Sequence, residues 1–178
     1  MKSNKSFLLL IILLFFIIAC TKQETQQTGE VVDMKIISSA FAQNSPIPSE
    51  FTCDEHNTSP PLMISDVPSN VKSLALIMDD PDAPIGTFVH WVAWNIPTST
   101  KQINKGNEPE GAAGKNGAGK TGYIGPCPPS GTHRYFFKLY ALDTTLNIPE
   151  GSNKKDLESA MQGHIIAKAE LMGTYKRK

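Results

Sequence analysis

A histidine, an arginine and a tyrosine stand together where a stiff loop meets a β-prone run: His133, Arg134 and Tyr135. Residues 125–131 are rich in proline, which presets φ, and in glycine, which permits positive φ, so they predict an irregular loop. A strand is predicted from residue 134 to 142, which puts His133 and Tyr135 on one face. Imidazole, guanidinium and phenol groups can donate hydrogen bonds to an anion, so the pattern indicates a binding site. The alternative is a turn before a core strand.

A second group with chemical potential is acidic. Asp79, Asp80 and Asp82 follow the apolar run 73–78, which is typical of a strand buried on both faces. Carboxylates this close repel one another unless cations or hydrogen-bond donors face them. Pro81 and Pro84 fix the course of the loop that carries these carboxylates. We therefore expect basic or donor groups opposite these acids.

The next predicted strand, 87–96, contains His90. Simple alternation would place His90 on one face with Phe88, Val92 and Trp94, and would place Val89, Trp91, Ala93 and Asn95 on the other. A histidine among large apolar groups is usually a core residue. His90 becomes a candidate for pairing if the fold brings it near the loop of Asp80.

The whole chain fits one mainly β domain. It has 178 residues and balanced charge, with 17 basic and 17 acidic side chains, which gives no indication of a nucleic-acid partner. Six or more strands are predicted, together with a short helix at 154–162 capped by Ser152 or Asn153, in which Leu157 and Met161 share a face. This pattern predicts a β-sandwich with one or two short peripheral helices.

The first 33 residues predict export. Two lysines precede an apolar run at 7–18, which is too short for a stable membrane span and matches a signal peptide at 1–19. The sequence before Cys20 resembles a bacterial lipobox, so we expect Cys20 to be lipidated and 20–33 to be a flexible tether. The alternatives are an ordinary signal peptide or an uncleaved anchor. The expected location is the cell envelope, on the periplasmic or extracytoplasmic face.

One sequence motif matches a phosphate-binding loop but lacks the flanking elements that such a loop needs. Residues 114–121 match the phosphate-loop pattern G-x-x-x-x-G-K-[ST], which functions only between a buried strand and a helix N-terminus. Here no strand is predicted before the match, and the glycines and prolines of 122–129 prevent a helix after it. We expect this match to be a chance feature of a glycine-rich loop.

Four segments in order carry a resemblance to a known family: 59–62 (SPPL), 79–84 (DDPDAP), 88–97 (FVHWVAWNIP) and 125–135. Together they resemble the phosphatidylethanolamine-binding protein (PEBP) family, in its bacterial Raf-kinase-inhibitor-like branch, over a domain at 34–178. The resemblance implies a β-sandwich with a small surface pocket for an anion, such as phosphate or a phosphoethanolamine headgroup.

The resemblance also implies a set of site residues. It places ligand binding at Asp80, His90, His133, Tyr135 and Pro126, and it places structural roles near the pocket at Asp82, Pro84, Trp91 and Arg134. Phosphate needs donors, which the two histidines and the tyrosine can supply. Asp80 suits the role of an acceptor that fixes the tautomer of one histidine or holds it protonated. For Arg134 we expect a buried ion pair, with Asp82 as its partner.

This chain also departs from the family pattern. Ile64 stands where bacterial relatives often have tryptophan, and Phe88 and Val89 occupy positions that are tryptophan and histidine in animal members. The differences at Phe88 and Val89 weaken any transfer of lipid selectivity. Kinase inhibition is not carried over, because nothing in the chain resembles the kinase-binding tail of animal members and an exported protein would not meet a cytosolic kinase. If Cys20 is lipidated, Cys53 and Cys127 remain as an even pair, which could be a disulfide or two free thiols.

Three functions remain open. The first is non-catalytic binding of a small anion or phosphorylated headgroup by an envelope-anchored protein, without cofactor or metal. The second is a protein-interaction role, such as inhibition of a protease or a kinase-type partner. The third is a metal-assisted hydrolase that uses His90, His133, Asp80 and Asp82, although the chain has no His-x-His or His-Glu-x-x-His pair.

Overall fold

A computed structural model describes residues 33–177 of the chain. The predicted signal peptide, Cys20 and nearly all of the predicted tether lie outside the described residues. Within 33–177, no helix is long and apolar enough to cross a membrane.

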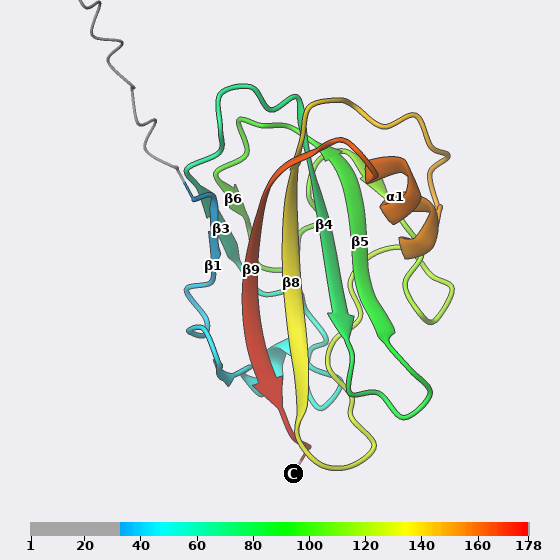
Figure 1. Cartoon of the computed structure of the whole chain (residues 1–178). Coiled ribbons are helices and arrows are strands. Elements are labelled where there is room, and N and C mark those ends of the chain that lie inside the picture. The colour runs from blue at the N-terminus through cyan, green and yellow to red at the C-terminus, as the bar shows by residue number, and fades with distance from the viewer. Residues whose placement is uncertain (1–32, 178) are drawn as a thin grey trace, which may run out of the picture. The chain divides into compact units, whose positions relative to one another are not determined.

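The described residues form two β-sheets (Figure 1). The smaller sheet has the order β1-β3-β6, and the larger has the order β2-β9-β8-β4-β5-β7. The strands of the smaller sheet are β1 (Lys35–Ile37), β3 (Leu62–Ser65) and β6 (Gln102–Ile103). Those of the larger sheet are β2 (Ser45–Pro46), β4 (Ser73–Asp80), β5 (Phe88–Ile96), β7 (Ala112–Ala113), β8 (His133–Leu142) and β9 (Ile165–Tyr175). Neighbouring strands are antiparallel except for the parallel pair β2 and β9.

The main hydrophobic core contains residues from both sheets. Leu62 and Ile64 of β3 belong to it, together with Leu76 and Met78 of β4 and Phe137 of β8. Every residue of β4 is buried, as the continuously apolar run at 73–78 predicts. The sheet pairing and this shared core confirm the predicted β-sandwich.

Among residues 33–177, two short helices accompany the sheets. The helix α1 (Lys154–Met161) begins at Asn153, whose side chain accepts hydrogen bonds from two backbone N–H groups while Asp156 completes a capping box. Leu157 and Met161 pack into a second apolar cluster with Ile77 and Trp94, on the opposite face of the larger sheet from the main core. The other helix is the 3₁₀ turn η1 (Ser49–Phe51).

Simple alternation along β5 is wrong, because the strand has a β-bulge at His90. Met78 of β4 pairs with Trp91 and Asp79 pairs with Val89, so His90 is an extra residue without a partner in this ladder. Val92 and Trp94 therefore pack under α1, whereas Trp91 and Ala93 lie in the main core. The bulge separates His90 from Val92 and Trp94 and turns it toward Tyr135 of β8.

The glycine-rich segment that matches the phosphate-loop pattern directly follows the two-residue strand β7, so the prediction that no strand precedes it is wrong. No helix follows the segment in residues 122–129, as predicted, so it does not lie between a strand and a helix. An antiparallel bridge joins Lys115 to Thr121, and the residues between them form turns. Asn116 holds this turn, because its side chain accepts hydrogen bonds from the N–H groups of Ala118 and Lys120. The match is therefore a chance feature, as its context predicts.

Candidate functional site

A cavity of about 290 Å³ opens at one end of the larger sheet. Its lining comes from the end of β4, the start of β5 and β8, and the two loops that Figure 1 shows at the same end of these strands. Asp80, His90 and His133 supply its polar side chains. Apolar residues and the disulfide supply most of the rest, namely Ala83, Pro84, Ile85, Phe88, Ile124, Gly125, Cys127, Pro128 and Pro129.

Asp80 and His133 form a buried pair inside this cavity. His133 donates a hydrogen bond from Nδ1 to Oδ2 of Asp80 over 2.7 Å, and both side chains are less than a tenth exposed. The other carboxylate oxygen of Asp80 accepts the backbone N–H of Asp82 at 2.8 Å. Asp80 thus acts as the acceptor that orients a histidine, and both of its oxygens are already occupied.

The other two carboxylates also face cations. Asp79 is buried on the opposite side of β4 from Asp80, and it accepts hydrogen bonds from Lys138 at 2.8 Å and Lys154 at 2.5 Å. Because each acid has its own partner, Asp79 and Asp80 can remain in β4, which extends two residues beyond the predicted end of the strand. The expectation that cations or donors face the acids is confirmed.

Arg134 forms the ion pair with Asp82, but this pair is not buried. Its Nε and Nη2 atoms bind the two carboxylate oxygens at 2.8 and 2.6 Å, and half of its side chain is exposed. Hydrogen bonds from the guanidinium hold the pKa of Asp82 down at about 2. The expected burial is wrong because Arg134 lies on the outer face of β8, where no further layer covers it. The arginine therefore braces the loop after β4 and points away from the cavity.

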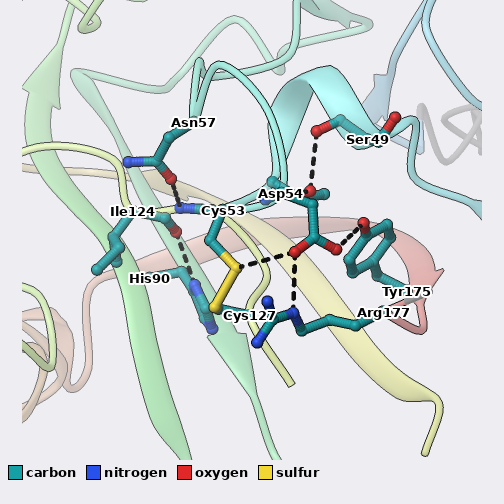
Figure 2. Close-up of a disulfide and its surroundings, with 11 residues drawn as sticks. Ser49, Cys53, Asp54, Asn57, His90, Ile124, Cys127, Tyr175 and Arg177 are labelled. Carbon is teal, nitrogen blue, oxygen red and sulfur yellow. Dashed lines mark hydrogen bonds and ion pairs between the residues drawn. A yellow bond between two sulfur atoms is a disulfide. The ribbon is translucent and has the colours of Figure 1, made fainter. Parts of the chain in front are cut away.

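His90 has a fixed tautomer. Its Nδ1 lies 2.7 Å from the carbonyl oxygen of Ile124, and a carbonyl can only accept, so the hydrogen is on Nδ1 (Figure 2). The ring packs edge-on against Phe88 and Tyr135. Burial lowers the pKa of His90 below 6.5, although the hydrogen bond to Ile124 and the charge of Asp80 oppose this shift. The neutral imidazole therefore presents the lone pair of Nε2 to any other partner.

Tyr135 lies behind the two histidines and is fully buried. It does not belong to the cavity lining. Within residues 33–177 its hydroxyl makes no hydrogen bond of normal geometry, although it interacts with the carboxylate of Asp80. Burial and the negative charge of Asp80 raise the pKa of this hydroxyl, which therefore stays protonated. Tyr135 is therefore a buried, protonated hydroxyl beside Asp80 and His90.

A disulfide forms part of the cavity wall. Cys53, in the loop after η1, is bonded to Cys127, which lines the cavity (Figure 2). This is the bonded alternative of the two that the sequence left open. On the far side of the disulfide, Asp54 accepts hydrogen bonds from Tyr175 at 2.6 Å and Arg177 at 2.9 Å. The loop after η1 therefore ties the cavity wall to the end of β9.

Two further contacts hold the same wall in place. The N–H of Gly125 donates to the side chain of Asn57 at 2.7 Å, and the hydroxyl of Tyr123 donates to the carbonyl of Phe51 at 2.7 Å. A Cβ atom on Gly125 would lie 2.5 Å from that same carbonyl oxygen. The close approach of the two loops therefore requires glycine at position 125.

Of the remaining predicted site residues, Pro126 and Trp91 lie outside the cavity lining, whereas Pro84 belongs to it. Pro126 is buried, and its carbonyl accepts the N–H of Cys53 at 3.1 Å. Pro128 and Pro129 are the prolines of this loop that line the cavity. Trp91 is buried in the main core, where its indole N–H donates to Glu108 at 2.6 Å.

Sequence reasoning missed several apolar lining residues. Ile85 is the clearest, because its side chain is 92% exposed at the mouth of the cavity. A signal was present, since an isoleucine between Pro84 and Gly86 cannot belong to a regular strand and must lie in a turn. Ile124 was also missed, and nothing in the sequence indicates that its carbonyl orients His90.

The protein is a β-sandwich in which two histidines, His90 and His133, line a cavity at one end of the larger sheet. The family model described as phosphatidylethanolamine-binding protein matches residues 37–176. The chain belongs to this family.

Relatives and solved structures agree with this assignment. The chain is 50% identical over 152 residues to a UPF0098 protein of Pyrococcus horikoshii, covering 80% of this chain and 76% of that protein. It is 49% identical over 150 residues to a UPF0098 protein of Methanothermobacter thermautotrophicus, covering 81% and 99%. A crystal structure of a PEBP homologue from Chlamydia trachomatis superposes with a TM-score of 0.80 at 44% identity, covering 83% of this chain and 99% of that one. Escherichia coli YbcL, described as a member of the mammalian PEBP family, gives 0.76 at 29% identity, covering 82% and 99%.

Proposed function

We propose that this protein binds a small anion or a phosphorylated headgroup, without catalysis, in the cavity that Asp80, His90 and His133 share. The observation that carries the proposal is the arrangement of the two imidazoles. Each has Nδ1 bound to a protein acceptor, which fixes its ring and leaves Nε2 for a ligand. Family membership is consistent with ligand binding of this kind.

The size and polarity of the cavity also suit such a ligand. A volume of about 290 Å³ lies just below the range for drug-sized ligands, and it suits a phosphate group with a small organic substituent. The apolar wall of Ile85, Phe88 and Pro129 offers a surface for that substituent. Within the described residues, no cluster of three or more histidine, cysteine or acidic side chains could hold a metal ion.

Titration with phosphoethanolamine tests the proposal. We expect saturable changes in the ¹⁵N NMR signals of the imidazoles of His90 and His133, and loss of binding in the variant His133→Ala. The matched control is His164→Ala, because His164 is exposed and paired with Asp143 away from the cavity. The absence of a saturable response to phosphoethanolamine and to inorganic phosphate would refute the proposal.

We also propose that the protein is exported and anchored to the cell envelope by a lipid on Cys20. Two features support this, namely the sequence of residues 1–20 and the disulfide between Cys53 and Cys127, since disulfides persist in oxidising compartments. Growth of the expressing bacterium with labelled palmitate tests the anchor. We expect label on the wild-type protein and none on Cys20→Ala.

A further inference from the structure

The cavity holds no permanent positive charge. Among its lining residues, only Asp80, His90 and His133 have polar side chains that could meet a ligand, and no lysine or arginine is present. The nearby Arg134 is turned outward to Asp82, and Lys138 and Lys154 bind Asp79 on the other face of β4. An anion that enters the cavity therefore depends on the protonation state of the histidines.

The hydrogen bonds of the two imidazoles decide what they offer. The Nδ1 hydrogen of His90 is donated to the carbonyl of Ile124, and that of His133 is donated to the carboxylate of Asp80. A neutral imidazole has one N–H group, so Nε2 of each ring is then a lone pair. In this state the side chains that line the cavity present acceptors only, and two lone pairs and a carboxylate repel an anion.

We propose that anion binding in this pocket is coupled to uptake of a proton at Nε2 of His90, so that affinity for anions falls as the pH rises. The inference rests on the proposed function and adds its regulation. Protonation converts Nε2 from an acceptor to a donor and places a positive charge beside the bound anion. The hydrogen bond to Ile124 is retained in both states, so the ring need not move.

The groups around His90 are consistent with this coupling. Asp80 faces it from β4, His133 and Tyr135 face it from β8, and Tyr123 belongs to the loop that passes over it. Asp79 is on the far side of β4 and is neutralised by two lysines. Burial outweighs the attraction of these carboxylates and lowers the pKa of His90, so the empty site holds a neutral ring at neutral pH.

The coupling has a defined sign and size. Above the pKa of His90 in the free protein, the fraction of molecules that can bind falls tenfold for each pH unit, and the apparent affinity falls with it. Below that pKa the affinity levels off. Sulfate is a suitable probe because its charge does not change over this range, whereas the second pKa of a phosphate ester is about 6.

Calorimetric titration of the purified protein with sulfate, between about pH 5.5 and 8.5, tests the proposal. We expect affinity to fall about tenfold per pH unit above about pH 6.5, and we expect uptake of about one proton when two buffers of different ionisation enthalpy are compared. The variant His90→Gln should lose this slope, because an amide can donate without titrating. The control His164→Gln should retain it.

A measurement on the wild-type protein makes the test independent of how well the variant folds. On saturation with sulfate at about pH 7, the ¹⁵N signal of Nε2 of His90 should change from an acceptor to an N–H position. Equal sulfate affinity at both ends of the pH range would overturn this proposal and leave anion binding intact. Failure of sulfate, phosphate and phosphoethanolamine to bind at every pH would overturn both proposals.

Discussion

Replacing both Cys53 and Cys127 with serine removes the covalent link between the loop after η1 and the cavity wall. The two residues are 74 positions apart, and the loss of such a long closed loop gives the unfolded chain more conformations. The chain-entropy relation converts this into a loss of about 4.5 kcal/mol of unfolding free energy at 25 °C. Both residues are exposed, so serine should fit without strain.

The expected change is large enough to measure in two ways. For a domain of about 145 residues, the unfolding entropy near the midpoint translates 4.5 kcal/mol into a fall of roughly 15 °C in Tm. Urea unfolding followed by the fluorescence of the buried Trp91 and Trp94 gives the free energy directly. The reduced wild-type protein should match the double serine variant, which makes it an internal control.

If the free energy of unfolding changes by less than about 1 kcal/mol while the urea m-value stays the same, the cross-link does not restrain the unfolded chain as the relation requires. Two free thiols in the denatured, unreduced protein would refute the starting point, which is the disulfide itself.

Three further predictions concern the cavity and its supports. Gly125→Ala should destabilise the protein by about 2 kcal/mol in urea unfolding, because the added Cβ would meet the carbonyl oxygen of Phe51 at 2.5 Å. The control Ser130→Ala, an exposed change in the same loop, should cost less than about 0.5 kcal/mol. Equal losses of stability in the two variants would contradict the predicted clash. Asp82→Asn should cost less than about 1 kcal/mol at neutral pH, because the pair with Arg134 is exposed. Since the folded-state pKa of Asp82 is depressed to about 2, this difference should be present above about pH 4 and vanish as the pH falls to about 2, and a difference that persists at that pH would contradict the assignment. For His90, ¹⁵N NMR at neutral pH should show the Nδ1–H tautomer and a titration midpoint below 6.5, whereas the opposite tautomer would contradict its hydrogen bond to Ile124.

The lowered pKa of His90 also has a consequence for stability. The unfolded chain takes up a proton at this residue near pH 6.5, whereas the folded protein does so only at lower pH. Below pH 6.5 the unfolded state is therefore favoured by this group, and the loss is complete once the folded-state pKa is passed. Anion binding opposes this loss under the proposed coupling.

Much of the fold could be predicted from local sequence. The apolar run in β4, the aromatic and β-branched residues of β5 and β8, and the cap at Asn153 each depend on neighbours within a few positions. The family resemblance added the residues that meet in the cavity, and Asp80, His90 and His133 do line it together. These features depend on neighbouring residues, or on short sequence motifs that occur in a fixed order along the chain.

Other features of the site depend on contacts between distant residues. The bulge at His90 arises from the register between β4 and β5, so alternation within β5 alone gives the wrong face for Val92 and Trp94. Burial of Arg134 was expected from its ion pair, yet whether a layer covers the outer face of β8 is a property of the packed sandwich.

The loop at 125–132, which precedes β8, shows which features of the site are local in sequence and which depend on tertiary contacts. Local sequence is enough to predict that an irregular loop leads to His133 at the start of a strand, because proline fixes φ and glycine permits positive φ. Which nitrogen of each imidazole is already occupied depends on the tertiary structure, because the acceptors that occupy Nδ1 are a carboxylate 53 residues away and a carbonyl 34 residues away. A hydrogen bond between such distant positions exists only once the strands have paired.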